Sequence, residues 1–130
     1  MKEYSADRIR NVAVASHQGT GKTSLVEAML FDSGCTTRLG RVEEGNTVCD
    51  WDPDEVKHHI SINTSLAPVE WNGYKINLID TPGYADFVGE VREGLRVADA
   101  VLMLVSAVDR VQVGTEITWQ AADDRGLAKV

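Results

Sequence analysis

A glycine-rich turn between a strand and a helix constrains this chain more than any other feature. Residues 10–16 are small and apolar without polar alternation, which predicts a strand buried on both faces. A helical pattern runs from Thr23 to about Phe31, and residues 17–23 before it read His-Gln-Gly-Thr-Gly-Lys-Thr. Glycines let such a turn curl closely around an anion, and the helix behind it directs its N-terminus at the same point. The strand, turn and helix together predict a phosphate-binding site in an α/β fold.

The residue types in this turn match what a nucleoside triphosphate requires. Gly19 and Gly21 free the backbone, and Lys22 supplies a charge for the outer phosphates. The Thr23 hydroxyl can ligate Mg²⁺. The strict pattern begins with a glycine, and this chain has Ser16 at that position. We expect the nucleotide-binding residues to be Gly19, Thr20, Gly21, Lys22, Thr23 and Ser24.

A second motif, Asp-Thr-Pro-Gly at residues 80–83, ends a later strand. Because Asp80 lies at the carboxyl end of that strand, it can hold Mg²⁺ through water. Gly83 offers a backbone N–H that can approach a γ-phosphate without a side chain in the way. The tetrapeptide alone also forms a simple turn. Its place after a strand, downstream of Gly-Lys-Thr, favours the phosphate-site interpretation.

The remaining pattern alternates strands and helices. Asn72-Gly73 between two strand-like runs predicts a hairpin. In the first helix, Leu25, Met29 and Leu30 share the expected apolar face. The further expected strands are residues 60–71, 74–79 and 100–105, and the further expected helices are residues 85–97 and 113–124. This order predicts a phosphate-loop NTPase fold, a mainly parallel sheet with helices on both faces. Since the last residues fall where such a fold begins its next strand, we expect residues 1–130 to be the N-terminal part of the domain, truncated before the strand that reads the base.

Residues 34–59 are predicted to form one long loop, because they contain several Gly and Pro residues and few regular apolar repeats. Acidic residues are concentrated in this segment, and no Lys or Arg lies among them. They are Glu43, Glu44, Asp50, Asp52, Asp54 and Glu55. We interpret them as the solvated face of a mobile segment that becomes ordered around Mg²⁺ and a γ-phosphate.

Composition excludes several other classes of protein. Thirteen basic and 20 acidic residues give the 130-residue chain a net charge of −7, so direct DNA binding is not expected. No apolar run approaches the length needed to cross a bilayer, and the first residues lack the apolar core of a secretory signal. The two cysteines, Cys35 and Cys49, do not make a disulfide framework. We expect a cytoplasmic protein without a membrane partner.

These motifs resemble those of the translational GTPases, and within them elongation factor G. The likeness is carried by residues 80–83 after residues 21–23, and further by residues 40–47, 50–51, 59–62, 71–80, 86–87, 90–91 and 95–99. It includes the first switch, the second switch and the helix after it, and covers the chain from about residue 9 to its end. Residues 105–109, together with the departures described below, look like the paralogous branch often called elongation factor G-like protein.

The resemblance implies a GTPase that hydrolyses GTP to GDP and phosphate with Mg²⁺, stimulated by the ribosome in the full-length protein. It assigns catalysis to Lys22, Gly83 and Tyr84, and Mg²⁺ binding to Thr23, Ser61 and Asp80. Ser61 stands where the family has a threonine and keeps the hydroxyl. The family reads guanine with an Asn-Lys-x-Asp motif that residues 1–130 do not contain. Guanine specificity therefore rests on the resemblance alone.

Two departures from the family leave alternatives open. Tyr84 replaces a histidine that helps to position the attacking water, and a phenol does not titrate near neutral pH as an imidazole does. Gly19 stands where the family often has an aspartate, which removes a carboxylate near the phosphates. One alternative is a GTP-dependent conformational switch with little or no hydrolysis. Another is an ATP-using phosphate-loop enzyme such as a small-molecule kinase, against which the Asp-Thr-Pro-Gly motif argues.

Overall fold

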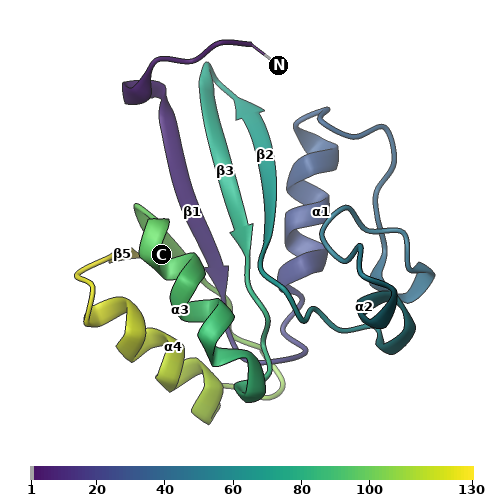
Figure 1. Cartoon of the computed structure of the whole chain (residues 1–130), viewed down its shortest axis with the longest axis vertical. Coiled ribbons are helices and arrows are strands. Elements are labelled where there is room, and N and C mark those ends of the chain that lie inside the picture. The colour runs from purple at the N-terminus through teal and green to yellow at the C-terminus, as the bar shows by residue number, and fades with distance from the viewer. Residues whose placement is uncertain (1) are drawn as a thin grey trace.

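A five-stranded sheet in the order β2-β3-β1-β4-β5 forms the centre of the computed structural model, which describes residues 2–130 (Figure 1). Its strands are β1 (Ile9–Ala15), β2 (Ser65–Trp71), β3 (Tyr74–Asp80), β4 (Ala100–Met103) and β5 (Ala128–Lys129). β2 is the antiparallel hairpin partner of β3, and the other neighbouring pairs are parallel. The mainly parallel sheet predicted from the sequence is therefore confirmed.

Helices cover both faces of this sheet (Figure 1). They are α1 (Lys22–Asp32), α2 (Pro53–His58), α3 (Val88–Val97) and α4 (Val113–Asp123). Successive side chains of β1 point to opposite faces and divide the core in two. Val14 packs with Val26 of α1. Ala13 belongs to the other cluster, with Leu95 of α3 and Ala122 of α4.

The register between β1 and β3 brings the two sequence motifs to one edge of the sheet. Val14 near the end of β1 is paired with Asp80, the last residue of β3. Thr81 then donates to the Val14 carbonyl from its N–H at 3.3 Å and from its hydroxyl at 2.8 Å. The carboxyl edge of a parallel sheet is where α/β folds bind ligands. The glycine-rich turn and residues 80–83 therefore meet at this edge.

The segment predicted as one long loop contains the short helix α2. Asp52 and Glu55 form a reciprocal capping box at its start. The strand expected from residue 60 was wrong in its first part, because β2 begins only at Ser65. The Glu55 carboxylate accepts the N–H groups of Ile62 and Asn63, both at 2.9 Å, and so holds these residues outside the strand ladder.

Smaller boundaries differ as well. The strand expected at residues 100–105 ends at Met103. The helix expected from residue 85 begins as a 3₁₀ turn, Ala85–Phe87, before α3. On α1 the expected apolar face was wrong at one position, since Val26 is fully buried and Leu25 only half-buried.

Candidate functional site

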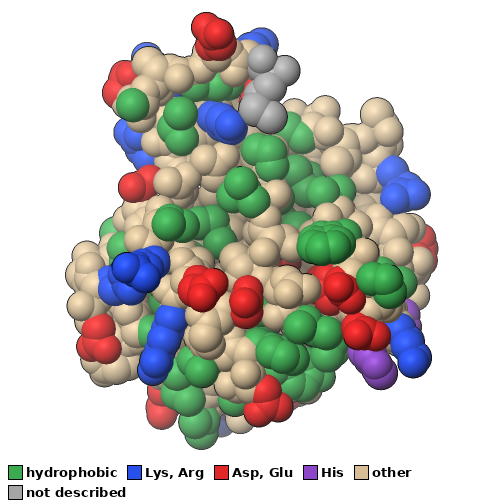
Figure 2. Space-filling view, in the orientation of Figure 1, with side chains coloured by type: hydrophobic (Ala, Val, Ile, Leu, Met, Phe, Trp, Pro, Cys, Tyr) green, Lys and Arg blue, Asp and Glu red, His purple; other side chains and the backbone are tan. Residues whose placement is uncertain are grey.

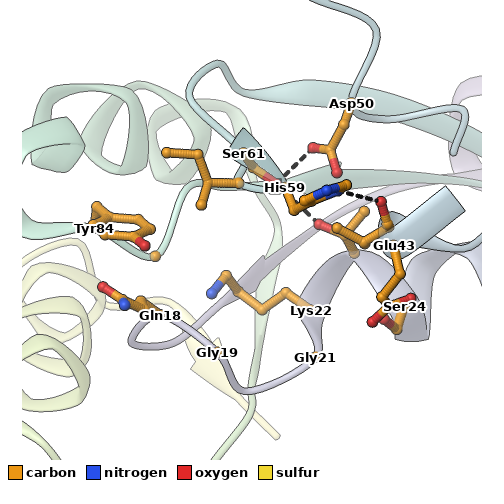
Figure 3. Close-up of a pocket in the computed structure, with 14 residues that line it drawn as sticks. Gln18, Gly19, Gly21, Lys22, Ser24, Glu43, Asp50, His59, Ser61 and Tyr84 are labelled. Atoms are coloured by element: carbon orange, nitrogen blue, oxygen red, sulfur yellow. Dashed lines mark hydrogen bonds between the residues drawn. The ribbon is translucent and has the colours of Figure 1, made fainter. Parts of the chain in front are cut away.

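A cleft of about 300 Å³ opens at the edge where β1 and β3 end (Figure 3). Its lining comes from the turn at residues 18–24, the segment at residues 42–61 and the turn at residues 83–84. Of the residues expected from the sequence, the lining includes Gly19, Gly21, Lys22, Thr23, Ser24, Ser61, Gly83 and Tyr84. Asp80 lies behind the lining, hydrogen-bonded to Thr23, and Thr20 is hydrogen-bonded within the turn.

The glycine-rich turn is curled tightly around the mouth of α1. Gly19 and Gly21 have φ angles of 76° and 86°, in the left-handed region that favours glycine. Gly21 is the N-cap of α1, so the free N–H groups of the first helical turn face the cleft. The Thr20 hydroxyl donates to the His17 carbonyl at 3.1 Å and closes the turn. N–H groups gathered in this way at a helix N-terminus bind phosphate.

Lys22 reaches into the cleft with unused hydrogen-bonding capacity. Its ammonium has three donors. Among the described residues, its partner is the His17 carbonyl, at 2.8 Å. Burial lowers the pKa of Lys22 to about 8, and the nearby Asp80 carboxylate partly opposes that shift. An anion placed against the ammonium would favour its charged form.

Gly83 lies so close to the glycine-rich turn that a side chain does not fit. A Cβ at this position would lie 2.5 Å from Lys22 Nζ and 2.7 Å from the Cα of Gln18. The tip of the lysine can move aside, whereas the main chain of Gln18 cannot move without distorting the turn. The backbone of Gly83 therefore borders the volume beside the Lys22 ammonium.

A cluster of hydroxyl and carboxylate oxygens lies on the other side of Lys22, and three of its four residues, Thr23, Asp50 and Ser61, line the cleft. The Thr23 hydroxyl donates to Asp80 Oδ2 at 2.7 Å and lies 3.0 Å from the Ser61 hydroxyl. Ser61 in turn donates to Asp50 Oδ1 at 2.7 Å (Figure 3). The second oxygens of both carboxylates, Asp80 Oδ1 and Asp50 Oδ2, are buried and have no hydrogen-bond partner among the described residues. Buried oxygens left unsatisfied in an all-oxygen set fit Mg²⁺, which prefers such ligands.

The electrostatics of this cluster also favour a cation. Burial raises the pKa of Asp80 to about 7, although the hydrogen bond from Thr23 and the charge of Lys22 act against the rise. Burial likewise raises the pKa of Asp50 above its ordinary value, against the hydrogen bond from Ser61. Two buried carboxylates repel one another, and a bound cation would stabilise the ionised form of both.

Asp50 and two other buried acids were missed as site residues by sequence reasoning. The interpretation of the acidic segment as a solvated face was wrong for Asp50 and Glu55, which are 5% and 1% exposed. Glu27 of α1 is also 1% exposed and accepts the N–H of Val48 at 2.6 Å. The capping pattern from Asp52 to Glu55 could have signalled the role of Glu55. Nothing local distinguishes Asp50 or Glu27 from exposed acids.

Tyr84 stands at the end of the cleft nearest Gln18 (Figure 3). Its ring is half-buried and packs edge-on against Phe87, with centroids 6.4 Å apart. The hydroxyl forms no hydrogen bond with any residue from 2 to 130. Tyr84 thus presents a free phenol to the volume that Lys22 and Gly83 border.

The described residues contain no group of three His, Cys, Asp or Glu side chains placed to hold a metal ion. The oxygen cluster differs from such a group because half of its side chains are hydroxyls. No helix within residues 2–130 is long and apolar enough to cross a membrane. On the face seen in Figure 2, acidic and basic side chains are interspersed. Both cysteines are free, Cys35 exposed and Cys49 buried.

A strand, a curled glycine turn carrying a lysine, and an aspartate at the end of the neighbouring strand define a phosphate-loop nucleotide-binding domain. The chain belongs to the family described as the elongation factor Tu GTP binding domain, whose model matches residues 7–130. The alternative of an ATP-using enzyme such as a small-molecule kinase does not fit this membership.

Curated relatives include translation factors of the elongation factor G type. The ribosome-releasing factor 2, mitochondrial, of Debaryomyces hansenii is 44% identical over 124 residues, covering 95% of this chain and 14% of the relative. The elongation factor G-like protein of Mycobacterium tuberculosis is 43% identical over 121 residues, covering 93% of this chain and 17% of the relative. The resemblance to this family is therefore confirmed. The chain spans about one sixth of the length of these relatives.

Solved structures agree with this assignment. A protein of Thermus thermophilus has a TM-score of 0.90 and 48% identity, covering 92% of this chain and 18% of its own. A bacterial selenocysteine-specific elongation factor, EF-Sec, has a TM-score of 0.74 at 22% identity, covering 91% of this chain and 18% of its own. The second likeness supports the fold alone.

Proposed function

We propose that this chain is the N-terminal part of the G domain of an elongation factor G-like translation factor that binds GTP with Mg²⁺ and hydrolyses it. The observation that carries the proposal is the cluster of Thr23, Ser61, Asp50 and Asp80, with two unpartnered carboxylate oxygens, beside the Lys22 ammonium. An array of oxygens next to a phosphate loop is what a Mg²⁺-nucleoside triphosphate requires. Family membership supports guanine as the base.

We assign each site residue a proposed contact with the phosphates or with Mg²⁺ according to its position in the cleft. Lys22 and the N–H groups of residues 19–24 would stabilise the negative charge of the phosphates. Thr23 and Ser61 would hold Mg²⁺ directly, and Asp80 would hold it through water. When bound, Mg²⁺ supplies positive charge that stabilises the β- and γ-phosphate oxygens. The N–H of Gly83 would contact the γ-phosphate and distinguish GTP from GDP.

Tyr84 supports a second candidate function, a GTP-dependent switch with little hydrolysis. The phenol beside the cleft has one hydroxyl in place of the two ring nitrogens of the family's histidine, so it offers the attacking water a different set of donors and acceptors. In that case the segment at residues 34–62 would still order around the γ-phosphate and Mg²⁺. Tyr84→His would then raise turnover, and unchanged turnover on ribosomes would count against this explanation.

The names of the relatives support the ribosome as partner of the full-length protein. We place its action in the cytoplasm. The word mitochondrial in the name of the Debaryomyces relative supplies the alternative, the ribosomes of that organelle.

The first experiment is nucleotide turnover by the full-length protein with GTP or ATP, with and without ribosomes. GTP-specific turnover that ribosomes stimulate is expected for the proposed translational GTPase. GTP binding without stimulated turnover would favour the switch. Equal use of ATP and GTP would contradict the assignment of guanine.

A further inference from the structure

The side chain of Gln18 is a polar group in the cleft that the roles above leave unused. Gln18 is exposed, lines the cleft, and follows directly on the buried His17. Its carboxamide forms no hydrogen bond with any of the described residues, 2–130. A carboxamide carries a donor and an acceptor at its tip, so it can bind a water molecule from either side.

The contacts of Gly83 place it directly beside the main chain of Gln18. The Cα and N of Gln18 are 2.7 and 2.8 Å from the place that a Cβ of Gly83 would occupy, and Lys22 Nζ is 2.5 Å from it. Gln18, Gly83 and Lys22 therefore surround one small volume. Figure 3 shows the Gln18 carboxamide and the Tyr84 ring at one end of the cleft, and the Ser61–Asp50 pair toward the other.

In this arrangement one end of the cleft holds the oxygen cluster proposed to bind Mg²⁺, and the other end is free for the water that attacks the γ-phosphate. With the γ-phosphate at the Gly83 N–H, as proposed above, the outermost phosphate faces the end of the cleft that holds Gln18 and Tyr84. Water attacks phosphorus in line with the leaving oxygen, so the attacking water belongs at the end opposite the departing diphosphate. Gly19 next in the chain has no side chain that could take this place.

We propose that Gln18 is the water-orienting residue of the site and that the Tyr84 hydroxyl assists it; this rests on the proposed GTPase function. The Gln18 carbonyl oxygen accepts a hydrogen bond from the attacking water and directs its lone pair at the γ-phosphorus. A bond forms between the water oxygen and the γ-phosphorus, and the bond from that phosphorus to the β–γ bridging oxygen breaks. The electron pair of that bond leaves on the bridging oxygen of GDP, and both protons of the water leave on the released phosphate. Gln18 takes up no proton in this step.

The test is single-turnover hydrolysis of bound GTP by the full-length protein carrying Gln18→Ala, with ribosomes present. We expect the hydrolysis rate to fall at least about tenfold, because a poorly oriented water loses the benefit of positioning. The Kd for a non-hydrolysable GTP analogue is expected to stay within about twofold, because the phosphate contacts come from Lys22 and the turn. Gln18→Asn keeps the carboxamide on a shorter side chain, so its hydrolysis rate should lie between those of the wild type and Gln18→Ala. Gln120→Ala on α4, another exposed glutamine, is the matched control.

A double-mutant cycle with Tyr84→Phe tests the assistance of the phenol. If both groups bind the same water, the double variant should be slowed less than the product of the two single effects. A rate unchanged in Gln18→Ala would overturn the proposal, as would a loss of analogue affinity equal to the loss of rate. A wild-type protein that binds GTP without hydrolysing it would overturn the proposed GTPase and this inference together, whereas wild-type hydrolysis that is insensitive to Gln18 overturns only the inference.

Discussion

The glycine-rich turn at residues 17–23 and the segment at residues 34–62 meet in one cleft but are held in different ways. The turn is closed by its own residues, such as the bonds from Thr20 and Lys22 to the His17 carbonyl. The segment is held largely by buried carboxylates, and one of them, Glu27, lies 21 residues before its partner Val48. The turn is therefore closed mainly by local hydrogen bonds, with one tertiary contact between the His17 ring and the Thr115 hydroxyl at 2.9 Å, whereas the segment depends on tertiary contacts.

We expect the segment at residues 34–62 to open more readily than the glycine-rich turn. A turn stabilised within a few residues keeps its shape when the surroundings change. A segment that depends on a few buried acceptors has fewer contacts to lose and opens more readily. We therefore predict that the glycine-rich turn is a fixed anion-binding wall of the cleft and that the segment at residues 34–62 is a wall that closes on a ligand.

The largest effect is expected from Lys22→Ala, which breaks the fixed wall. Loss of a charge-assisted contact to the outer phosphates should weaken GTP binding by about 100-fold or more. The fold should survive, because the variant removes a buried ammonium with one described partner. Titration with a fluorescent GTP analogue measures the effect, and Lys57→Ala on the exposed side of α2 is the control. Unchanged affinity would refute the phosphate-loop assignment.

Gly83→Ala should disturb the close contact between residue 83 and the glycine-rich turn. The new Cβ would overlap the Gln18 main chain, and overpacking of this kind costs about 1–3 kcal/mol. We expect affinity for a GTP analogue to fall by about tenfold or more while affinity for GDP changes little, because only GTP reaches Gly83.

The matched control for this substitution is Gly89→Ala. Gly89 lies on α3 with nothing within 4 Å of an added Cβ, so a neutral or slightly stabilising effect is expected. Calorimetric unfolding of both variants shows whether the clash destabilises the fold as well. Equal nucleotide binding by both variants would show that Gly83 does not touch the nucleotide.

The same local-versus-tertiary distinction explains what could be predicted from the sequence. The strand, the turn and α1 were predicted nearly to the residue, because glycine conformations and helix caps act over a few positions. The hairpin at Asn72-Gly73 was predicted for the same reason. Asp50 could not be recognised as a site residue, since its burial depends on Ser61 and on the packing of the whole segment.

The start of β2 at Ser65, five residues later than the sequence predicts, also has a tertiary cause. Residues 60–64 have a strand-like pattern, but Glu55 takes the N–H groups of two of them. A side chain that competes for backbone donors is invisible to a periodicity argument. The three buried acids are thus the part of the site that required the structure.

Glu27→Gln should weaken the attachment of the segment at residues 34–62 and leave the glycine-rich turn unchanged. The Glu27 carboxylate accepts the N–H groups of Val48 and Cys49 at 2.6 and 3.4 Å, and a neutral amide is a weaker acceptor. We expect the free energy of unfolding to fall by about 1–2 kcal/mol. Amide exchange at residues 40–50 should become faster, while exchange in β1 stays the same. Glu93→Gln on the exposed side of α3 is the control, and equal exchange in both variants would contradict the role of Glu27.

The smallest effect concerns the two thiols, which report on the opening of the segment. Burial, together with the Asp80 and Glu27 carboxylates, raises the pKa of the Cys49 thiol well above its ordinary value, and only a thiolate reacts quickly with labelling reagents. At about pH 8 a maleimide should therefore modify exposed Cys35 first and reach Cys49 only when the segment opens. The pKa of Cys49 is higher in the folded than in the unfolded chain. The free energy of unfolding should therefore fall as the pH rises above the pKa that the thiol has in the unfolded chain.

Cys35→Ser leaves Cys49 as the single thiol and makes its labelling rate a direct measure of opening. Glu27→Gln in this background should raise that rate by about tenfold, which corresponds to its expected loss of stabilisation. A GTP analogue with Mg²⁺ should lower the rate by about two- to threefold, because the segment then closes on the ligand. Labelling of Cys49 that neither change affects would show that the segment opens only when the whole domain unfolds, and the distinction between a fixed and a closing wall would fail.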